Sequence, residues 1–132
     1  MARLLLVEDT QEIWDFLSRR LARRGFEVLL AHDGQSGVDK ALAERPDVIL
    51  LDMNMPIMDG WTAARLLKGA PETASIPIIA LTAHALAGDR DKAMAAGCDD
   101  YHPKPVDFSR LIEQVDAALA RKGAAASAGA AG

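Results

Sequence analysis

A run of four apolar residues, Val48-Ile49-Leu50-Leu51, ends directly in the carboxylate of Asp52. The run is short and does not alternate between apolar and polar residues. This pattern is typical of a central parallel strand that is covered by helices on both faces. A carboxylate at the C-terminal end of such a strand lies where open α/β sheets bind their ligands. The sequence therefore predicts an α/β sheet with Asp52 at its ligand-binding edge.

The rest of the chain alternates short apolar runs with helical patterns. Such alternation predicts a parallel sheet with right-handed crossovers and helices on both faces. The order of the strands in the sheet does not follow from periodicity. We expect strands at 3–7, 27–31, 48–52, 78–82 and 100–102, and helices at 11–24, 34–44, 60–68, 86–96 and 108–121.

Apolar spacing and capping residues support the predicted helices. In the first helix, residues three or four positions apart form one apolar stripe that we expect to face the core: Ile13, Phe16, Leu17 and Leu21. Aspartates precede three of the helices and are expected to cap them: Asp33, Asp59 and Asp107. The helix at 86–96 is rich in alanine, which buries little surface, so we expect it to be the least stable.

Length and composition indicate one domain. Residues 1–122 of the 132 are expected to form it, and residues 123–132, which are only Gly, Ala and Ser, are expected to be a disordered tail. A net charge of −4 with mixed signs predicts no nucleic-acid binding. Cys98 is the single cysteine, so no internal disulfide can form. The chain shows neither a signal-peptide pattern nor an apolar stretch long enough to span a membrane, so we expect a cytoplasmic protein without membrane association.

Polar side chains follow four of the predicted strands. Glu8 and Asp9 follow the first, Asp52 ends the third, Thr82 ends the fourth, and Lys104 follows the fifth. Because parallel strands share one C-terminal edge, these side chains are expected to converge. Three neighbouring carboxylates repel one another unless a cation offsets their charge. A ligand set made only of oxygens favours Mg²⁺, which prefers a phosphate as its further partner.

These residue types fit phosphoryl transfer to a carboxylate. Asp52 is the candidate nucleophile, since a metal and nearby cations can activate an aspartate for this role. Thr82 and Lys104 are placed to contact the phosphoryl oxygens. Catalysis of this kind consists mainly of positioning and charge stabilisation.

Several motifs in this order resemble the receiver domains of bacterial two-component response regulators, the CheY-like family. The resemblance covers residues 4 to about 119, and its motifs are Glu8-Asp9, the run 51–56 with Asp59-Gly60, Leu81-Thr82-Ala83, and Lys104-Pro105. It implies a flavodoxin-like, doubly wound, five-stranded parallel sheet in the order 2-1-3-4-5 with five helices. It also implies a cis peptide bond between Lys104 and Pro105.

The resemblance implies a role for each matching residue. Asp52 is similar to the phosphoacceptor of the family, and Thr82 and Lys104 to its two phosphate-sensing residues. The implied Mg²⁺ ligands are Glu8, Asp9, Asp52 and the backbone carbonyl of Asn54. Tyr101 occupies the position of the aromatic switch residue. Two positions in the family tune the lifetime of the phosphoryl group, and they correspond to Asn54 and His84.

The resemblance also implies partners and an output. The phosphoryl donor is expected to be a sensor histidine kinase or a histidine phosphotransfer protein. Ile13 and Trp14 on the first helix are candidate contacts for this donor, and Leu86 is a candidate output contact. Phosphorylation is expected to change partner binding through the face formed by the fourth helix, the fifth strand and the fifth helix. We expect a stand-alone signalling protein that promotes only its own phosphorylation and dephosphorylation, and not an enzyme with a separate substrate.

Three other interpretations fit parts of the sequence. The chain could be the receiver part of a larger regulator or of a hybrid kinase. A phosphohydrolase of the haloacid-dehalogenase type also uses an aspartate nucleophile with Mg²⁺, but it needs an acid two residues further on, where this chain has Asn54. A flavodoxin-type redox protein needs a phosphate-binding loop after the first strand, where this chain has two acids.

Overall fold

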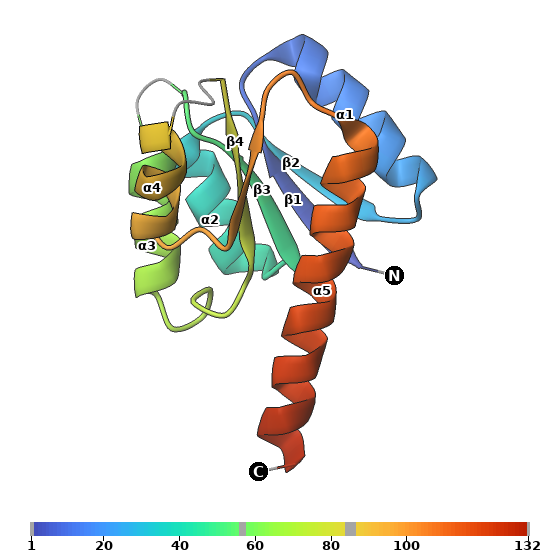
Figure 1. Cartoon of the computed structure of the whole chain (residues 1–132), viewed down its shortest axis with the longest axis vertical. Helices are drawn as coiled ribbons and strands as arrows, with labels where there is room; N and C mark the ends of the chain where they lie inside the picture. Colours follow the sequence, from blue (N-terminus) through green and yellow to red (C-terminus); the bar gives the residue numbers. More distant parts are fainter. Residues whose placement is uncertain (1, 56–57, 84–86, 132) are drawn as a thin grey trace.

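The structure is a computed structural model and describes residues 2–55, 58–83 and 87–131. Strands and helices alternate along the chain, as the sequence predicts (Figure 1). The strands are β1 (Arg3–Val7), β2 (Glu27–Ala31), β3 (Val48–Asp52), β4 (Ile78–Thr82) and β5 (Asp100–Pro103). The helices are α1 (Gln11–Arg23), α2 (Gly34–Glu44), α3 (Gly60–Gly69), α4 (Ala87–Ala95) and α5 (Phe108–Ala131).

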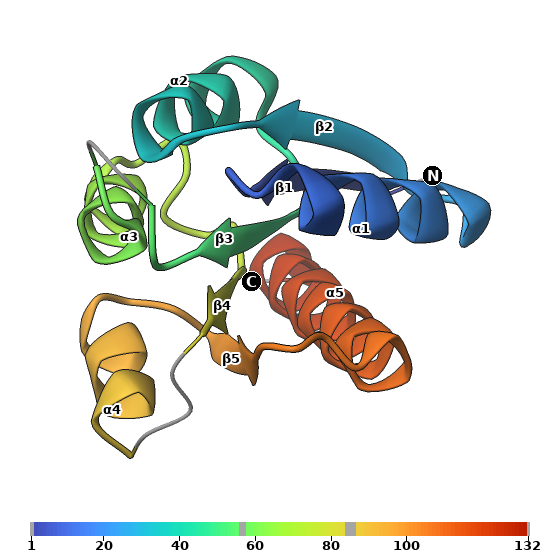
Figure 2. The ribbon, with the colours of Figure 1, turned by 90° about the horizontal axis from the view of Figure 1, so that it is seen from above.

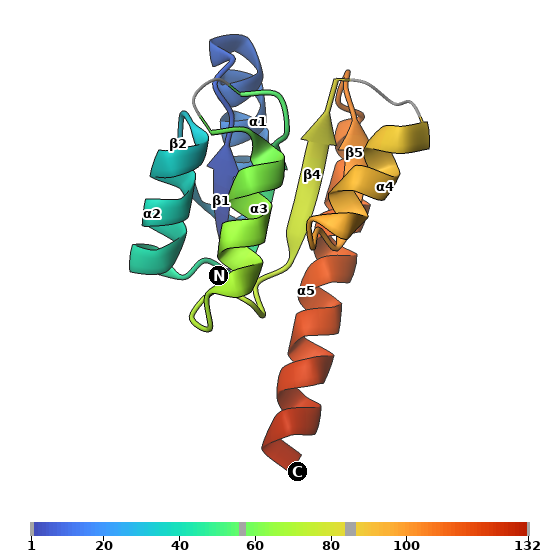
Figure 3. The ribbon, with the colours of Figure 1, turned by 90° about the vertical axis from the view of Figure 1, so that its left-hand side faces the viewer.

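The strands form one parallel sheet in the order β2-β1-β3-β4-β5, which confirms the order that the resemblance implied. Helices α2, α3 and α4 cover one face of the sheet, and α1 and α5 cover the other (Figure 2). Figure 3 shows the first of these faces, with α2, α3 and α4 in front of the strands. In the register of the sheet, Val7 lies opposite Leu51, and Asp52 lies opposite Leu81. The ends of β1, β3 and β4 therefore meet at one edge.

Strand β3 is buried along its whole length. Ile49 and Leu51 pack with the apolar cluster under α2, α3 and α4, while Val48 and Leu50 pack with α1 and α5. Successive side chains of a strand point to opposite faces, so a strand with helices on both sides needs an apolar residue at each position. This explains the absence of alternation in the sequence.

Local contacts start the helices where the sequence predicts. The side chains of Asp33 and Asp59 each accept the backbone N–H three residues further on, at 2.7 and 2.8 Å. Gly60 brings the start of α3 against the end of β3. A Cβ atom at Gly60 would lie 2.5 Å from the carbonyl oxygen of Asp52 and 2.6 Å from the Cα of Met53. Only glycine allows this approach, which holds the segment after Asp52 close to α3.

The end of α5 differs from the expectation. The helix was predicted to end near residue 121, before a disordered tail, but it continues to Ala131 and extends beyond the rest of the molecule (Figure 1). Alanine has the highest helix propensity, and lengthening a helix that is already anchored requires no new nucleation. Helices α1 and α4 end one residue earlier than predicted, α3 and β5 end one residue later, and the predicted start of α4 at Leu86 lies outside the described residues. The Lys104–Pro105 peptide bond is cis, as the resemblance implied. Within the described ranges, no helix has both the length and the apolar character that crossing a membrane requires.

Candidate functional site

Three carboxylates meet at the C-terminal edge of the sheet. Glu8 and Asp9 follow β1, Asp52 ends β3, and one oxygen from each lies within 4.8 Å of the others. Glu8 and Asp52 are buried, whereas Asp9 is exposed. The adjacency of β1 and β3 in the sheet thus brings together the three acids that the sequence predicted to converge.

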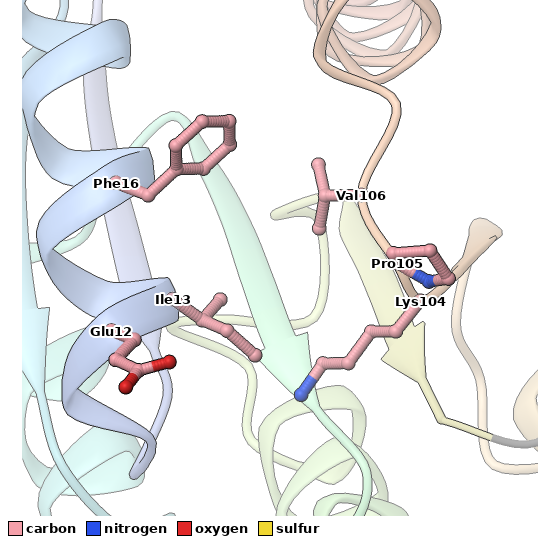
Figure 4. Close-up of a pocket in the computed structure, with 6 residues that line it drawn as sticks. All are labelled: Glu12, Ile13, Phe16, Lys104, Pro105 and Val106. Carbon is pink, nitrogen blue, oxygen red and sulfur yellow. The ribbon is translucent and has the colours of Figure 1, made fainter.

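Lys104 supplies the positive charge of this cluster. Its Nζ lies 3.0 Å from Glu8 Oε2 and 3.3 Å from Asp52 Oδ1. The backbone N–H of Lys104 donates to the carbonyl oxygen of Thr82 at 2.7 Å, which fixes the start of the loop after β5 against the end of β4. The side chain extends from that loop toward the end of β3 (Figure 4). One ammonium group therefore serves two buried carboxylates.

The carboxyl group of Asp52 ionises less readily than an ordinary aspartate. The pKa of Asp52 is raised from its usual 3.8 to about 7, mainly by burial and also by the negative charge of Glu8. The backbone N–H of Asn54, which donates to Asp52 Oδ1 at 3.0 Å, and the ammonium of Lys104 act in the opposite direction and lower the pKa. The site thus carries more negative charge than its own cation can offset.

The arrangement of oxygens fits a hard divalent cation. Glu8 Oε1 accepts the backbone N–H of Thr10 at 3.1 Å, and the buried Glu8 Oε2 lies 3.0 Å from the ammonium of Lys104. The cluster offers only carboxylate oxygens, which suit Mg²⁺ better than the transition metals that favour imidazole or thiolate. Glu8, Asp9 and Asp52 are the residues that would hold such an ion.

The other predicted site residues lie around this cluster. Thr82 is buried at the end of β4, the strand next to β3. The side chain of Asn54 is exposed, and its predicted carbonyl contact with Mg²⁺ stays a prediction. Tyr101 on β5 is half-buried, and the guanidinium of Arg90 lies 5.9 Å from the centre of its ring. His84 and Leu86 lie outside the described residues.

A pocket of about 310 Å³ opens beside Lys104, between α1 and the loop that precedes α5 (Figure 4). Phe16 was expected to face the core, but its side chain is 41% exposed because it lies at the rim of this pocket. Sequence reasoning found only one apolar member of the lining, Ile13, because Pro105 and Val106 come from a loop without periodicity. The lining residues are Glu12, Ile13, Phe16, Lys104, Pro105 and Val106.

Trp14, the second predicted donor contact, does not line this pocket. Its indole ring stacks on the imidazole of His32 with the ring centres 5.0 Å apart and an angle of 22° between the ring planes. The indole Nε1 is buried and has no hydrogen-bond partner among the described residues. Trp14 thus packs toward the end of β2, and Ile13 faces the pocket.

The raised pKa of Asp52 predicts a specific effect of pH on stability. Between about pH 4 and pH 7, the folded protein keeps a proton on Asp52 that the unfolded chain has lost, so the free energy of unfolding falls as the pH rises. The Asp52→Asn variant lacks this titration. In urea unfolding with a chelator present, its stability relative to the unsubstituted protein should rise by about 2 kcal/mol from pH 5 to pH 8.

Added Mg²⁺ is the control for this prediction. At pH 8 the ion should reduce the difference in the free energy of unfolding between the two proteins, because it stabilises the ionised cluster of the unsubstituted protein. A stability difference that does not change with pH would show that Asp52 ionises as an ordinary aspartate.

Curated relatives cover nearly all of this chain but only part of their own length. The response regulator MprA of Mycobacterium tuberculosis is 38% identical over 119 residues, which make up 90% of this chain and 51% of MprA. The transcriptional regulatory protein PrrA of Mycobacterium leprae is 38% identical over 125 residues, or 95% of this chain and 53% of PrrA. The chain therefore spans about half the length of these relatives.

Solved structures share the fold, and a family match agrees with them. The receiver domain of sensor histidine kinase PA1611 from Pseudomonas aeruginosa, solved with a magnesium ion coordinated in its active site cleft, has a TM-score of 0.85 and 35% identity, covering 90% of this chain and 98% of that one. Chemotaxis protein CheY4 of Vibrio cholerae has a TM-score of 0.84 and 30% identity, covering 89% and 98%. Residues 4–116 match the response regulator receiver domain family. With these matches and its five-stranded parallel sheet, the chain belongs to the response regulator receiver domains of two-component signalling.

Proposed function

We propose that Asp52 accepts a phosphoryl group from a phosphohistidine with the help of Mg²⁺. The observation that carries this proposal is the contact of 3.3 Å between Lys104 Nζ and the buried Asp52 Oδ1, within 4.8 Å of two further acids. In this transfer the N–P bond of the donor breaks and an O–P bond to Asp52 forms. The donor histidine leaves, and the aspartyl phosphate remains on the chain.

Each surrounding residue has a part in the proposed transfer. Glu8, Asp9, Asp52 and the carbonyl of Asn54 would hold Mg²⁺, which would supply charge stabilisation for the transferred oxygens. Lys104 leaves its two carboxylates to pair with the incoming phosphoryl group, and Thr82 donates its hydroxyl to the same oxygens. The chain acts only on its own Asp52, so it is a signalling phosphoacceptor and not an enzyme with a separate substrate.

Acetyl phosphate tests the acceptor directly. Incubation of the purified chain with acetyl phosphate and Mg²⁺ should add the mass of one phosphoryl group, because a small acyl phosphate can replace the protein donor. Asp52→Asn should abolish the adduct in intact-mass spectra, and a chelator should do the same. Asp59→Asn is the matched control: Asp59 is an exposed cap whose role asparagine can fill, so this variant should gain the same mass. An adduct that persists in Asp52→Asn would refute the assignment.

We further propose that the phosphoryl donor docks on the pocket beside Lys104. Receiver domains exchange phosphate with histidine kinases or phosphotransfer proteins. The pocket places the apolar side chains of Ile13, Phe16 and Val106 next to the residue that would contact the phosphoryl group. A donor helix seated there would present its histidine at the edge of the sheet that holds Asp52.

Two exposed apolar residues give a matched test of this docking surface. Phe16 on α1 is 41% exposed and Leu42 on α2 is 38% exposed, on opposite faces of the sheet. With any purified phosphotransfer protein that phosphorylates the unsubstituted chain, Phe16→Ser should slow the transfer by about tenfold or more, the loss of a contact worth over 1 kcal/mol. Leu42→Ser should leave it unchanged. Both variants should react normally with acetyl phosphate, which needs no docking surface. Equal transfer rates for the two variants would place the donor elsewhere.

We propose in addition that phosphorylation is read through Thr82 and Tyr101. Thr82 would move toward the phosphoryl oxygens, and the Tyr101 ring would turn inward, away from Arg90. Helix α4, strand β5 and helix α5 would then present a changed face. The phosphoryl group shifts a balance between two states that exist beforehand.

Amide chemical shifts can follow this switch. Acetyl phosphate should shift resonances of α4 and α5 in the unsubstituted protein. In Tyr101→Ala these distant shifts should be lost, while those next to Asp52 remain, because the truncated side chain cannot respond to Thr82. Tyr101→Phe keeps the ring and should retain the distant shifts. If Tyr101→Ala responds in α4 and α5 as the unsubstituted protein does, Tyr101 has no switch role.

The relatives bear on the context of this receiver. PrrA is named a transcriptional regulatory protein, and this chain matches about half of its length. Stand-alone action, the absence of nucleic-acid binding and a cytoplasmic location therefore stay predictions.

A further inference from the structure

His102 is a buried imidazole that the proposed phosphoryl transfer does not use. It lies on β5, two residues before Lys104, and its side chain is 1% exposed. Its Nε2 lies 3.1 Å from the backbone nitrogen of Asp107, and its Nδ1 lies 2.7 Å from Oε1 of Gln114. Gln114 Nε2 in turn lies 2.8 Å from the carbonyl oxygen of Tyr101. The imidazole thus stands between β5 and α5.

The donor and acceptor of each hydrogen bond in this series, from Asp107 through His102 and Gln114 to Tyr101, follow from the two backbone groups at its ends. The Asp107 backbone N–H can only donate, so His102 Nε2 accepts and the ring proton resides on Nδ1. The Tyr101 carbonyl oxygen can only accept, so the amide nitrogen of Gln114 points to it and Gln114 Oε1 faces His102. The imidazole is therefore neutral and in its Nδ1–H form, because an imidazolium would oppose the Asp107 N–H with a second donor.

These bonds hold the loop that carries Lys104 from both sides. At its start, the Lys104 N–H donates to the Thr82 carbonyl oxygen at 2.7 Å. Three residues later, the Asp107 N–H donates to His102. Lys104 stands at the first of these anchors, and its Nζ reaches Glu8 Oε2 at 3.0 Å and Asp52 Oδ1 at 3.3 Å.

We propose that His102 is a positioning residue for Lys104, acting through its Nε2 bond to Asp107. Its Nδ1 bond, relayed by Gln114, ties α5 to the β5 backbone at Tyr101. The inference rests on the proposed phosphoryl transfer to Asp52. It adds to that site His102, a residue that touches no reacting atom. It also gives α5 a direct link to the loop that would contact the phosphoryl group.

Three substitutions separate the two bonds of the imidazole. The side-chain oxygen of glutamine can reach the place of Nε2, so His102→Gln keeps an acceptor for the Asp107 N–H. The side-chain nitrogen of asparagine can occupy the place of Nδ1, so His102→Asn keeps only the donor to Gln114. His102→Leu fills a similar volume and keeps neither bond. The rate of phosphorylation is measured at saturating acetyl phosphate and Mg²⁺. Circular dichroism first establishes which variants are folded, and only folded variants are compared.

The Nε2 bond should control the rate. We expect His102→Leu and His102→Asn to lower the rate at saturation by about tenfold, and His102→Gln to stay within about threefold of the unsubstituted protein. Unfolding by urea is recorded for each variant. Rates that remain equal among the folded variants, or that follow stability and not the presence of an Nε2-like acceptor, would overturn the proposal and leave His102 as packing.

Imidazole ¹⁵N shifts of the unphosphorylated protein provide a second measurement that needs no phosphoryl transfer. They should show the neutral Nδ1–H form of His102, and an Nε2–H form would overturn the inference whether or not Asp52 is phosphorylated. Conversely, if the unsubstituted protein gains no phosphoryl group, the proposed function itself fails, while a normal rate in His102→Leu contradicts only the positioning role.

Discussion

The ion pairs between Lys104 and the buried carboxylates of Glu8 and Asp52 are the constraint on which this site depends. Burying like charges is costly unless cations face them. One ammonium lies within 3.3 Å of both carboxylates, while Asp9 adds a third acid at the exposed side. Burial, together with the negative charge of Glu8, raises the pKa of Asp52. The oxygens of this cluster fit a hard divalent cation such as Mg²⁺.

The sheet makes this arrangement rigid. Strand β3 lies between β1 and β4, and every residue of β3 is buried, so the position of Asp52 is determined by packing on both faces. The close approach of Gly60 to the end of β3 fixes the segment that follows. The loop after β5 is attached less directly, through the bond from Lys104 to Thr82 and the chain of bonds from His102 to α5. Asp52 thus stands on a strand that is buried along its whole length, and Lys104 stands on a loop that these hydrogen bonds attach to the sheet and to α5.

The strands and helix starts could be predicted from the sequence because each depends on residues close together in the chain. Burial on both faces makes each central strand a continuous apolar run, and the caps at Asp33 and Asp59 act on N–H groups three residues away. The three acids were found because chain direction alone places the ends of parallel strands at one edge. Periodicity wrongly predicted that Phe16 faces the core. It identifies the apolar positions of a helix, but it does not show whether another helix or strand covers them. The sequence did not predict the full length of α5, because a segment of only Gly, Ala and Ser was expected to be disordered when considered apart from the preceding helix.

The sequence by itself determined the alternation of strands and helices, the convergence of the acids, and the resemblance to the receiver family. These depend on residue type, on spacing within one element, and on the common direction of parallel strands. Only the tertiary structure decided that Ile13 and Phe16 line a pocket with the loop after β5, that Trp14 stacks on His32, and that His102 joins Asp107 to Gln114. Each of these contacts joins different elements, and its geometry depends on how helices rotate and seat against the sheet, which no local pattern encodes.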